Sequence, residues 1–219
     1  MSYPSSGPAS APGGSSYNTG GPVAPTVSQA GLQDVFSSWV TSLTRPSAAT
    51  YANEATRATQ NRIWLSVGAG VIISAILGLI SGLLSGNLVG DFVKTLILAV
   101  IQFVIVAGSY YAGAKIMKGT ATLEQHAWVT STYWAPITVL SNIPLIGWLL
   151  GLVGAFYMIY LEYLTIQGVQ RLDGQNAMIA TGIGAVIAVV VGWIVALIVG
   201  IILIAIGLGT AATTSILGG

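Results

Sequence analysis

The sequence predicts an all-α fold, a polytopic membrane bundle of five transmembrane helices preceded by an amphipathic helix and a disordered tail. Two features of the composition lead to this prediction. Only 6% of the 219 residues are charged, whereas 54% are hydrophobic, and the mean hydropathy is +0.82. A soluble domain carries about 25% charged residues, so this chain lacks the surface that a soluble enzyme needs. A disordered chain would be far less hydrophobic.

The chain begins with a low-complexity segment over residues 1–30, in which Ser, Pro and Gly make up 17 of the 30 residues. Such a segment buries too little apolar surface to offset the ordering of its backbone, so we expect a disordered cytoplasmic tail. It also lacks the charged start and apolar centre of a signal peptide. We therefore expect the first membrane span to insert the chain.

Residues 31–61 are predicted to form an amphipathic helix and a linking helix. In the first helix, apolar side chains recur at helical spacing on one face. These are Leu32, Val35, Phe36, Trp39, Val40 and Leu43. The pattern is typical of a helix in the plane of the membrane interface, and packing of the same face against the membrane domain is the alternative. Pro46 ends this helix, and we expect a polar helix over 47–61 to run into the first span.

Gaps between charged residues delimit the membrane domain over residues 62–207. A span needs about 20 residues, and a 37-residue run without a charge is divided by the turn signal Asn142-Ile143-Pro144. The predicted spans are 62–86, 93–117, 125–141, 145–168 and 177–207, and 208–219 form a short C-terminal tail. The third span contains Pro136, and a re-entrant loop there is the alternative to a full crossing.

The positions of lysine and arginine predict the orientation of the chain. On the five-span interpretation, six of the seven basic residues lie on one side: Arg45, Arg57, Arg62, Lys115, Lys118 and Arg171. Only Lys94 lies on the other side. Since basic residues favour the cytoplasmic side, we expect a cytoplasmic N-terminus and a C-terminus outside.

Small residues repeat along one face of the first and last spans. The candidates for close helix packing are Gly78, Gly82, Gly86, Gly192, Ala196 and Gly200. Small side chains let helix backbones approach each other within a membrane, where no hydrophobic effect drives association. We interpret these faces as packing within the chain, and the alternative is a homo-oligomer contact.

Three residues within the spans are candidates for function. Glu162 is the acid placed well inside a span, which is a functional hypothesis by default, although a carboxyl near the interface between Tyr160 and Tyr163 is the alternative. Gln102 lies mid-span and is expected to form a hydrogen bond between helices, and Pro136 interrupts the third span.

No enzyme, cofactor or metal site is predicted from the residue types. The chain has no Cys and one His, whereas a metal site needs three or four converging ligands. No catalytic motif appears. No cluster of basic residues indicates nucleic-acid binding.

Three motifs resemble the prokaryotic branch of the Yip-domain family of Ypt/Rab-interacting membrane proteins. They are Thr-Leu-Glu-Gln-His at 122–126, Tyr-Trp-Ala-Pro at 133–136 and Ile-Pro-Leu-Ile-Gly-Trp at 143–148. The resemblance covers residues 32–207 and implies a five-span bundle in the plasma membrane of a prokaryote. Eukaryotic relatives bind prenylated Rab GTPases through a longer cytoplasmic region. A short tail stands in its place here, so GTPase binding is not carried over.

The leading hypothesis is a non-enzymatic membrane protein that organises or scaffolds membrane components or membrane shape. Its partners are then the lipid bilayer and either a second copy or other membrane proteins. The alternative is a permease or channel for a small solute or ion, with a polar path near Glu162.

Overall fold

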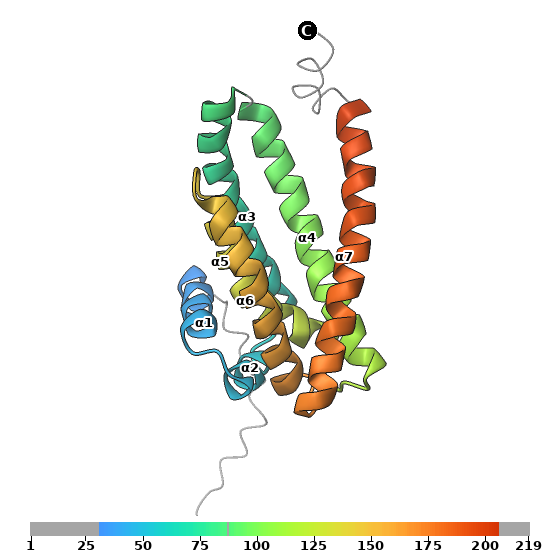
Figure 1. Ribbon diagram of the computed structural model, residues 1–219. Coiled ribbons are helices and arrows are strands. Elements are labelled where there is room, and N and C mark those ends of the chain that lie inside the picture. The colour runs from blue at the N-terminus through green and yellow to red at the C-terminus, as the bar shows by residue number, and fades with distance from the viewer. Residues whose placement is uncertain (1–30, 87, 206–219) are drawn as a thin grey trace, which may run out of the picture.

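The computed structural model describes residues 31–86 and 88–205, and these residues form seven helices and no strand (Figure 1). The all-α class is therefore confirmed. The helices are α1 (Leu32–Thr44), α2 (Ala48–Ala55), α3 (Gln60–Ser85), α4 (Leu88–Ile116), α5 (Leu123–Ser141), α6 (Gly147–Gly168) and α7 (Gly174–Ala205). The predicted tails, 1–30 and 208–219, lie outside the described residues.

Four of the described helices, α3, α4, α6 and α7, are long and apolar enough to cross a membrane. They occupy the first, second, fourth and fifth predicted spans, and their bounds differ from the predicted ones by a few residues. The physical reason for this agreement is simple. A helix that faces lipid cannot carry charges along that side, so gaps between charges mark such helices in the sequence.

Helix α5 corresponds to the third predicted span and lies at the centre of the bundle. Twelve of its 19 residues are buried, and α1, α2, α3, α4 and α6 all contact it. Its polar and aromatic composition keeps it outside the group of four apolar helices. Pro136 lies inside α5, and the helix continues past it to Ser141.

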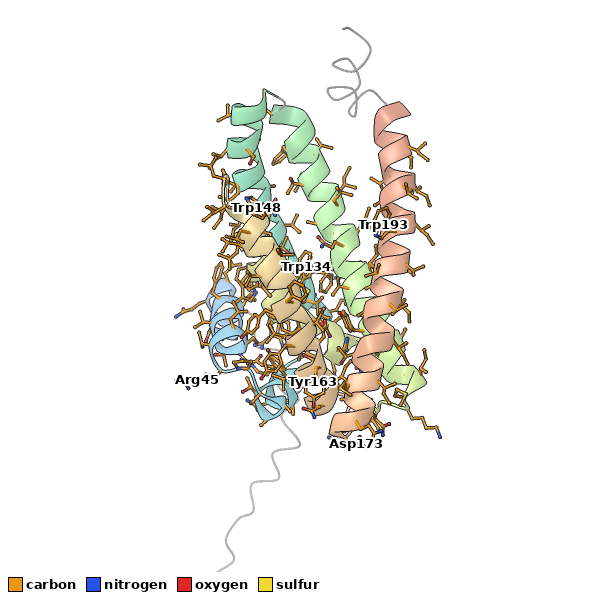
Figure 2. The ribbon with its side chains drawn as sticks, in the orientation of Figure 1. Arg45, Trp134, Trp148, Tyr163, Asp173 and Trp193 are labelled. Atoms are coloured by element: carbon orange, nitrogen blue, oxygen red, sulfur yellow. The ribbon has the colours of Figure 1, made fainter. Side chains whose placement is uncertain are left out.

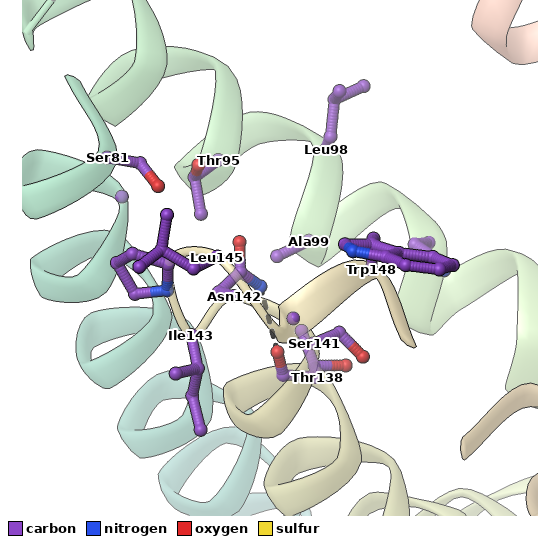
Figure 3. Close-up of a pocket in the computed structure, with 14 residues that line it drawn as sticks. Ser81, Thr95, Leu98, Ala99, Thr138, Ser141, Asn142, Ile143, Leu145 and Trp148 are labelled. Carbon is purple, nitrogen blue, oxygen red and sulfur yellow. Dashed lines mark hydrogen bonds between the residues drawn. The ribbon is translucent and has the colours of Figure 1, made fainter. Parts of the chain in front are cut away.

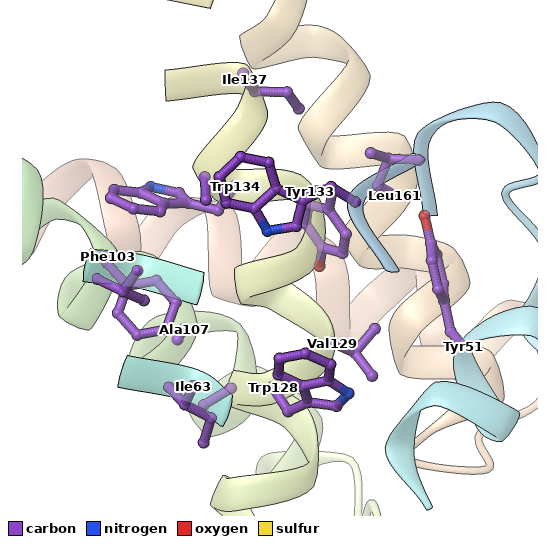
Figure 4. Close-up of a cluster of buried hydrophobic side chains, with 14 of the residues drawn as sticks. Tyr51, Ile63, Phe103, Ala107, Trp128, Val129, Tyr133, Trp134, Ile137 and Leu161 are labelled. Atoms are coloured by element: carbon purple, nitrogen blue, oxygen red, sulfur yellow. The ribbon is translucent and has the colours of Figure 1, made fainter. Parts of the chain in front are cut away.

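Aromatic side chains of α5 fill the core (Figure 4). Trp128, Tyr133 and Trp134 are fully buried. The ring of Trp134 lies 5.2 Å from that of Phe103 on α4, and the ring of Tyr133 lies 5.7 Å from that of Tyr51 on α2. Each such pair contributes about 0.5–1.5 kcal/mol beyond burial. The α5 aromatics therefore connect the long helices to the short N-terminal ones.

The bundle has two distinct ends, which we call the α2 end and the far end. Figure 1 shows α2 at the end where α7 begins, whereas the α3–α4 turn and the C-terminal part of α7 lie at the far end. Helices α4 and α6 run back toward the α2 end. The α5–α6 turn lies below the α3–α4 turn along the bundle, so the α5–α6 hairpin reaches less far toward the far end than the α3–α4 hairpin does.

The helix expected over 47–61 is wrong between residues 56 and 59, where the structure has a break. Local capping explains the two separate helices. The Ser47 side chain accepts a hydrogen bond from the N–H of Thr50 at the start of α2. The Thr59 side chain accepts one from the N–H of Arg62 at the start of α3. Capping by Ser or Thr favours a new helix start, which reorients the chain between α2 and α3.

The closest helix contact on α7 involves its N-terminal half. A Cβ atom added to Gly113 of α4 would meet the carbonyl oxygen of Ala180 and lie 2.8 Å from the backbone nitrogen of Gly184. A Cβ added to Gly192 or Gly200 would meet no described atom within 4 Å. The α4–α7 contact therefore depends on Gly113 and Gly184.

The other predicted packing residues occupy different surroundings. Gly78 and Gly82 are buried on α3, and Ala196 is exposed on α7. Gly86 follows α3 with φ of 76°, a left-handed conformation that glycine adopts without strain. Its position therefore serves the α3–α4 turn.

Candidate functional site

Glu162 lies in the C-terminal third of α6, where its side chain is fully buried against α5. The hydroxyl of Thr130 donates a hydrogen bond of 3.2 Å to its Oε1. The hydroxyl of Tyr133 donates in turn to Thr130 Oγ1 at 3.3 Å and lies 3.2 Å from Thr165 Oγ1. A chain of hydroxyls from α5 and α6 thus surrounds the carboxyl.

His126 faces the same carboxyl from the first turn of α5. Its Nε2 lies 3.6 Å from Glu162 Oε2, and both side chains are fully buried. This separation exceeds a hydrogen bond, and neither ring nitrogen has a partner among the described residues. The sequence does not predict this pair, because the two residues lie far apart in the chain and no spacing rule connects them.

Glu162 and His126 are both fully buried. Four cavities among the described residues have linings that include none of Glu162, His126 and Pro136. The same part of the chain contains no group of three or more residues able to hold a metal ion. The cluster is therefore suited to holding α5 and α6 together through polar contacts within the bundle.

Polar contacts also attach α1 to the bundle. The indole nitrogen of Trp39 donates to Ser66 Oγ on α3 at 2.8 Å, and Ser42 Oγ lies 2.7 Å from Thr132 Oγ1 on α5. Farther along, the hydroxyl of Tyr157 on α6 donates to the carbonyl oxygen of Leu43 at 3.0 Å. One helical face of α1 thus reaches three long helices.

Ion pairs join the beginning of α1, the C-terminal end of α2 and the beginning of α3. Asp34 Oδ2 lies 2.8 Å from Arg62 and 3.3 Å from Arg57, and Arg57 also lies 3.2 Å from Glu54. The Arg62 guanidinium lies 5.7 Å from the ring centroid of Trp128, within the range of cation–π attraction. Because Asp34 is partly exposed, these pairs set the position of α1 more than its stability.

Tyr51 of α2 also helps to attach α1 to the protein. Its hydroxyl donates to the carbonyl oxygen of Ser42 at 2.9 Å. Burial raises the pKa of the Tyr51 phenol well above its ordinary value, and nearby Tyr157 and Glu162 raise it further. The phenol therefore stays protonated and remains a donor to α1.

The structure divides the predicted apolar face of α1 into two parts. Val35 and Trp39 are buried, together with Ser38 and Ser42, and form the docking face. Leu32, Phe36 and Val40 remain exposed by 52%, 40% and 61%, and form what we call the outer stripe. Packing against the protein, one of the two expectations for this helix, therefore applies to the docking face.

Gln102 lines two adjoining cavities near the α5–α6 turn. The first, the turn cavity, has a volume of about 490 Å³ and lies between α3, α4 and this turn (Figure 3). The second, the inner cavity, has a volume of about 340 Å³ and is lined by α4, α5, α6 and α7. The interhelical hydrogen bond expected for Gln102 is absent, since its side chain bonds to no described residue.

Two features thus stand out beyond the helix bundle itself: the attached α1 with its outer stripe, and the pair of cavities at Gln102. Comparison with protein families, characterised proteins and solved structures found no match to this chain.

Proposed function

We propose that this chain is a non-enzymatic, five-span membrane protein that organises membrane components by shaping the membrane around it. The fifth span in this proposal is α5. Its 19 residues have a length of about 28 Å at 1.5 Å per residue, close to the hydrocarbon thickness of about 30 Å. Polar side chains are acceptable there because protein, not lipid, surrounds them. The Yip-domain resemblance supports the same architecture.

The distribution of basic residues supports a cytoplasmic α2 end. The residues at helix ends and turns on this side are Arg45, Arg57, Arg62, Lys115, Lys118 and Arg171. Figure 2 shows Arg45 near this end, whereas Trp148 and Trp193 lie along the outer surface farther up the bundle. Basic residues favour the cytoplasmic side of a membrane. The resemblance further supports the plasma membrane of a prokaryote.

The observation that carries the proposed function is the position of α1. Polar contacts fix this helix against one side of the bundle toward the α2 end, and its outer stripe faces away from the protein. A helix of 13 residues is about 20 Å long and 10 Å wide, so α1 occupies about 200 Å² of one leaflet. An inclusion in one leaflet only favours a curved membrane.

Curvature sorting tests this proposal. The full chain is reconstituted into a mixture of small and large vesicles, and protein density per membrane area is measured in each. We expect enrichment in small vesicles and its loss in the triple variant Leu32→Ala, Phe36→Ala, Val40→Ala. The matched control on the same helix is Gln33→Ala, Ser37→Ala, Thr41→Ala, which retains the outer stripe. Equal density of the wild-type protein in all vesicles contradicts membrane shaping.

A scaffold role has its own test in native membranes. Crosslinking of the intact chain is expected to capture recurrent membrane-protein neighbours or a second copy. A strictly monomeric protein without recurrent neighbours contradicts the scaffold form of the proposal. GTPase binding is not included, because nothing in the described helices replaces the longer region of the eukaryotic relatives.

The cavities at Gln102 favour one second candidate function, a permease or channel for a small solute or ion. Glu162 would have to adjoin such a path, and it is sealed within the bundle. Flux of ions and small solutes into liposomes tests this candidate. It predicts conduction by the wild-type protein that Glu162→Gln alters and the exposed control Glu124→Gln does not. A wild-type protein that conducts nothing excludes it.

A further inference from the structure

The turn cavity has the size and chemistry of a ligand site. Its volume of about 490 Å³ falls within the range of small-molecule pockets, about 300–1,000 Å³. The polar residues of its wall are Ser81, Thr95, Gln102, Thr138, Ser141 and Asn142. None of the lining residues that the structure describes has an ionisable side chain. Such a wall suits an uncharged ligand that forms hydrogen bonds.

Several polar groups of this wall lack a protein partner. The side chains of Gln102 and Ser81 bond to no described residue. Asn142 donates through Nδ2 to the carbonyl oxygen of Thr138 at 2.8 Å, and its Oδ1 accepts no bond from the described chain. Gln102 is exposed, whereas Ser81 and Asn142 are half-buried, and all three line the turn cavity. Their unpaired polar groups are therefore available to a ligand that forms hydrogen bonds.

The inner cavity adds an apolar compartment to this polar one. The two cavities share Gln102, Thr138, Ser141 and Asn142. Most of the remaining inner wall is apolar, as shown by Val106, Ile137, Met158, Ile159, Ala188 and Val189. A polar cavity that adjoins an apolar one matches an amphiphilic ligand. A lipid has both a polar and an apolar part, whereas a soluble polyol has no part that would fill the apolar cavity.

We infer that the two cavities together bind a lipid with an uncharged, hydroxyl-bearing head group, the class of diacylglycerols and glycosylated diacylglycerols. The head group lies in the turn cavity and an acyl chain lies in the inner cavity. Trp148, which lines the turn cavity and is 73% exposed, is the residue type favoured at the level of lipid head groups. This inference requires a membrane location but not the membrane-shaping role.

Native mass spectrometry of the full chain tests the site. The protein is reconstituted with phosphatidylcholine and a minor fraction of a monoglycosyl diacylglycerol, and bound lipids are counted after release. We expect the glycolipid to be retained over phosphatidylcholine. Gln102→Leu should reduce this preference about tenfold, the effect of losing one or two hydrogen bonds. The matched control, Gln175→Leu, changes an exposed glutamine at the α2 end and should retain the preference.

A second variant tests the apolar compartment without changing the polar wall. Ala188→Phe fills part of the inner cavity and should also reduce lipid retention. Equal retention of both lipids by the wild-type protein overturns the inference, and so does unchanged retention in both cavity variants. Displacement of the glycolipid by millimolar free hexose identifies a soluble polyol as the ligand and also overturns the lipid assignment. Curvature sorting is measured separately, so failure of one proposal does not decide the other.

Discussion

Replacing Gly113 with alanine tests the close contact between α4 and α7. The new methyl group would lie 2.8 Å from the backbone nitrogen of Gly184 and would also meet the carbonyl oxygen of Ala180. These are backbone atoms that cannot rotate away, so the two helices must separate. Overpacking of this kind costs about 1–3 kcal/mol. The same change at Gly108 of α4 meets no atom within 4 Å.

The comparison between these two variants isolates the steric effect. Both gain about 1 kcal/mol from the higher helix propensity of alanine, so that term cancels in the difference. We expect Gly108→Ala to be more stable than Gly113→Ala by about 1–3 kcal/mol. Equilibrium unfolding in mixed detergent micelles, followed by tryptophan fluorescence, measures the difference. Equal stability of the two variants would refute the α4–α7 contact.

Three further predictions concern the attachment of α1 and α2. Trp39→Phe removes a hydrogen bond of 2.8 Å to Ser66, which lowers the free energy that holds α1 to the bundle by about 1 kcal/mol. Amide exchange in α1 should therefore increase. Trp193→Phe, at an exposed position, should leave it unchanged. Because its pKa is raised, Tyr51 should support the attachment fully below pH about 10 and lose this contribution as the pH rises further. Tyr51→Phe should abolish that alkaline increase in exchange. Gly168→Ala should displace α2, because the new methyl meets the carbonyl oxygen of Ala48, and crosslinking between α2 and α6 should fall.

The lipid-facing helices were the most predictable part of the fold. Charged groups are excluded from such surfaces, so the spacing of charges indicates α3, α4, α6 and α7 without knowledge of their packing. The spacing of charges is a weaker guide to α5. Neighbouring helices provide partners for its polar groups, so α5 does not need to be as apolar as a helix that faces lipid. Its position at the centre follows from tertiary packing alone.

The side-chain clusters were much less predictable. Ser38 and Ser42 are not part of the predicted apolar face of α1, yet both are buried because Glu54 and Thr132 supply hydrogen-bond partners. Helical periodicity shows which side chains of a helix prefer water. It does not show which hydrogen-bond partners the neighbouring helices will provide. For Glu162, the sequence indicated an unusual carboxyl but not its contact with α5.

The burial of α5 has a consequence for how the protein enters a membrane. A segment containing Gln125, Thr130 and Ser131 partitions poorly into lipid by itself, although it is stable once other helices surround it. On the proposed five-span topology, we therefore expect α5 to remain at the insertion machinery until α6 has been synthesised, and the two helices to enter the membrane together as a hairpin. Biogenesis then depends on α3 and α4 already being in place to receive it.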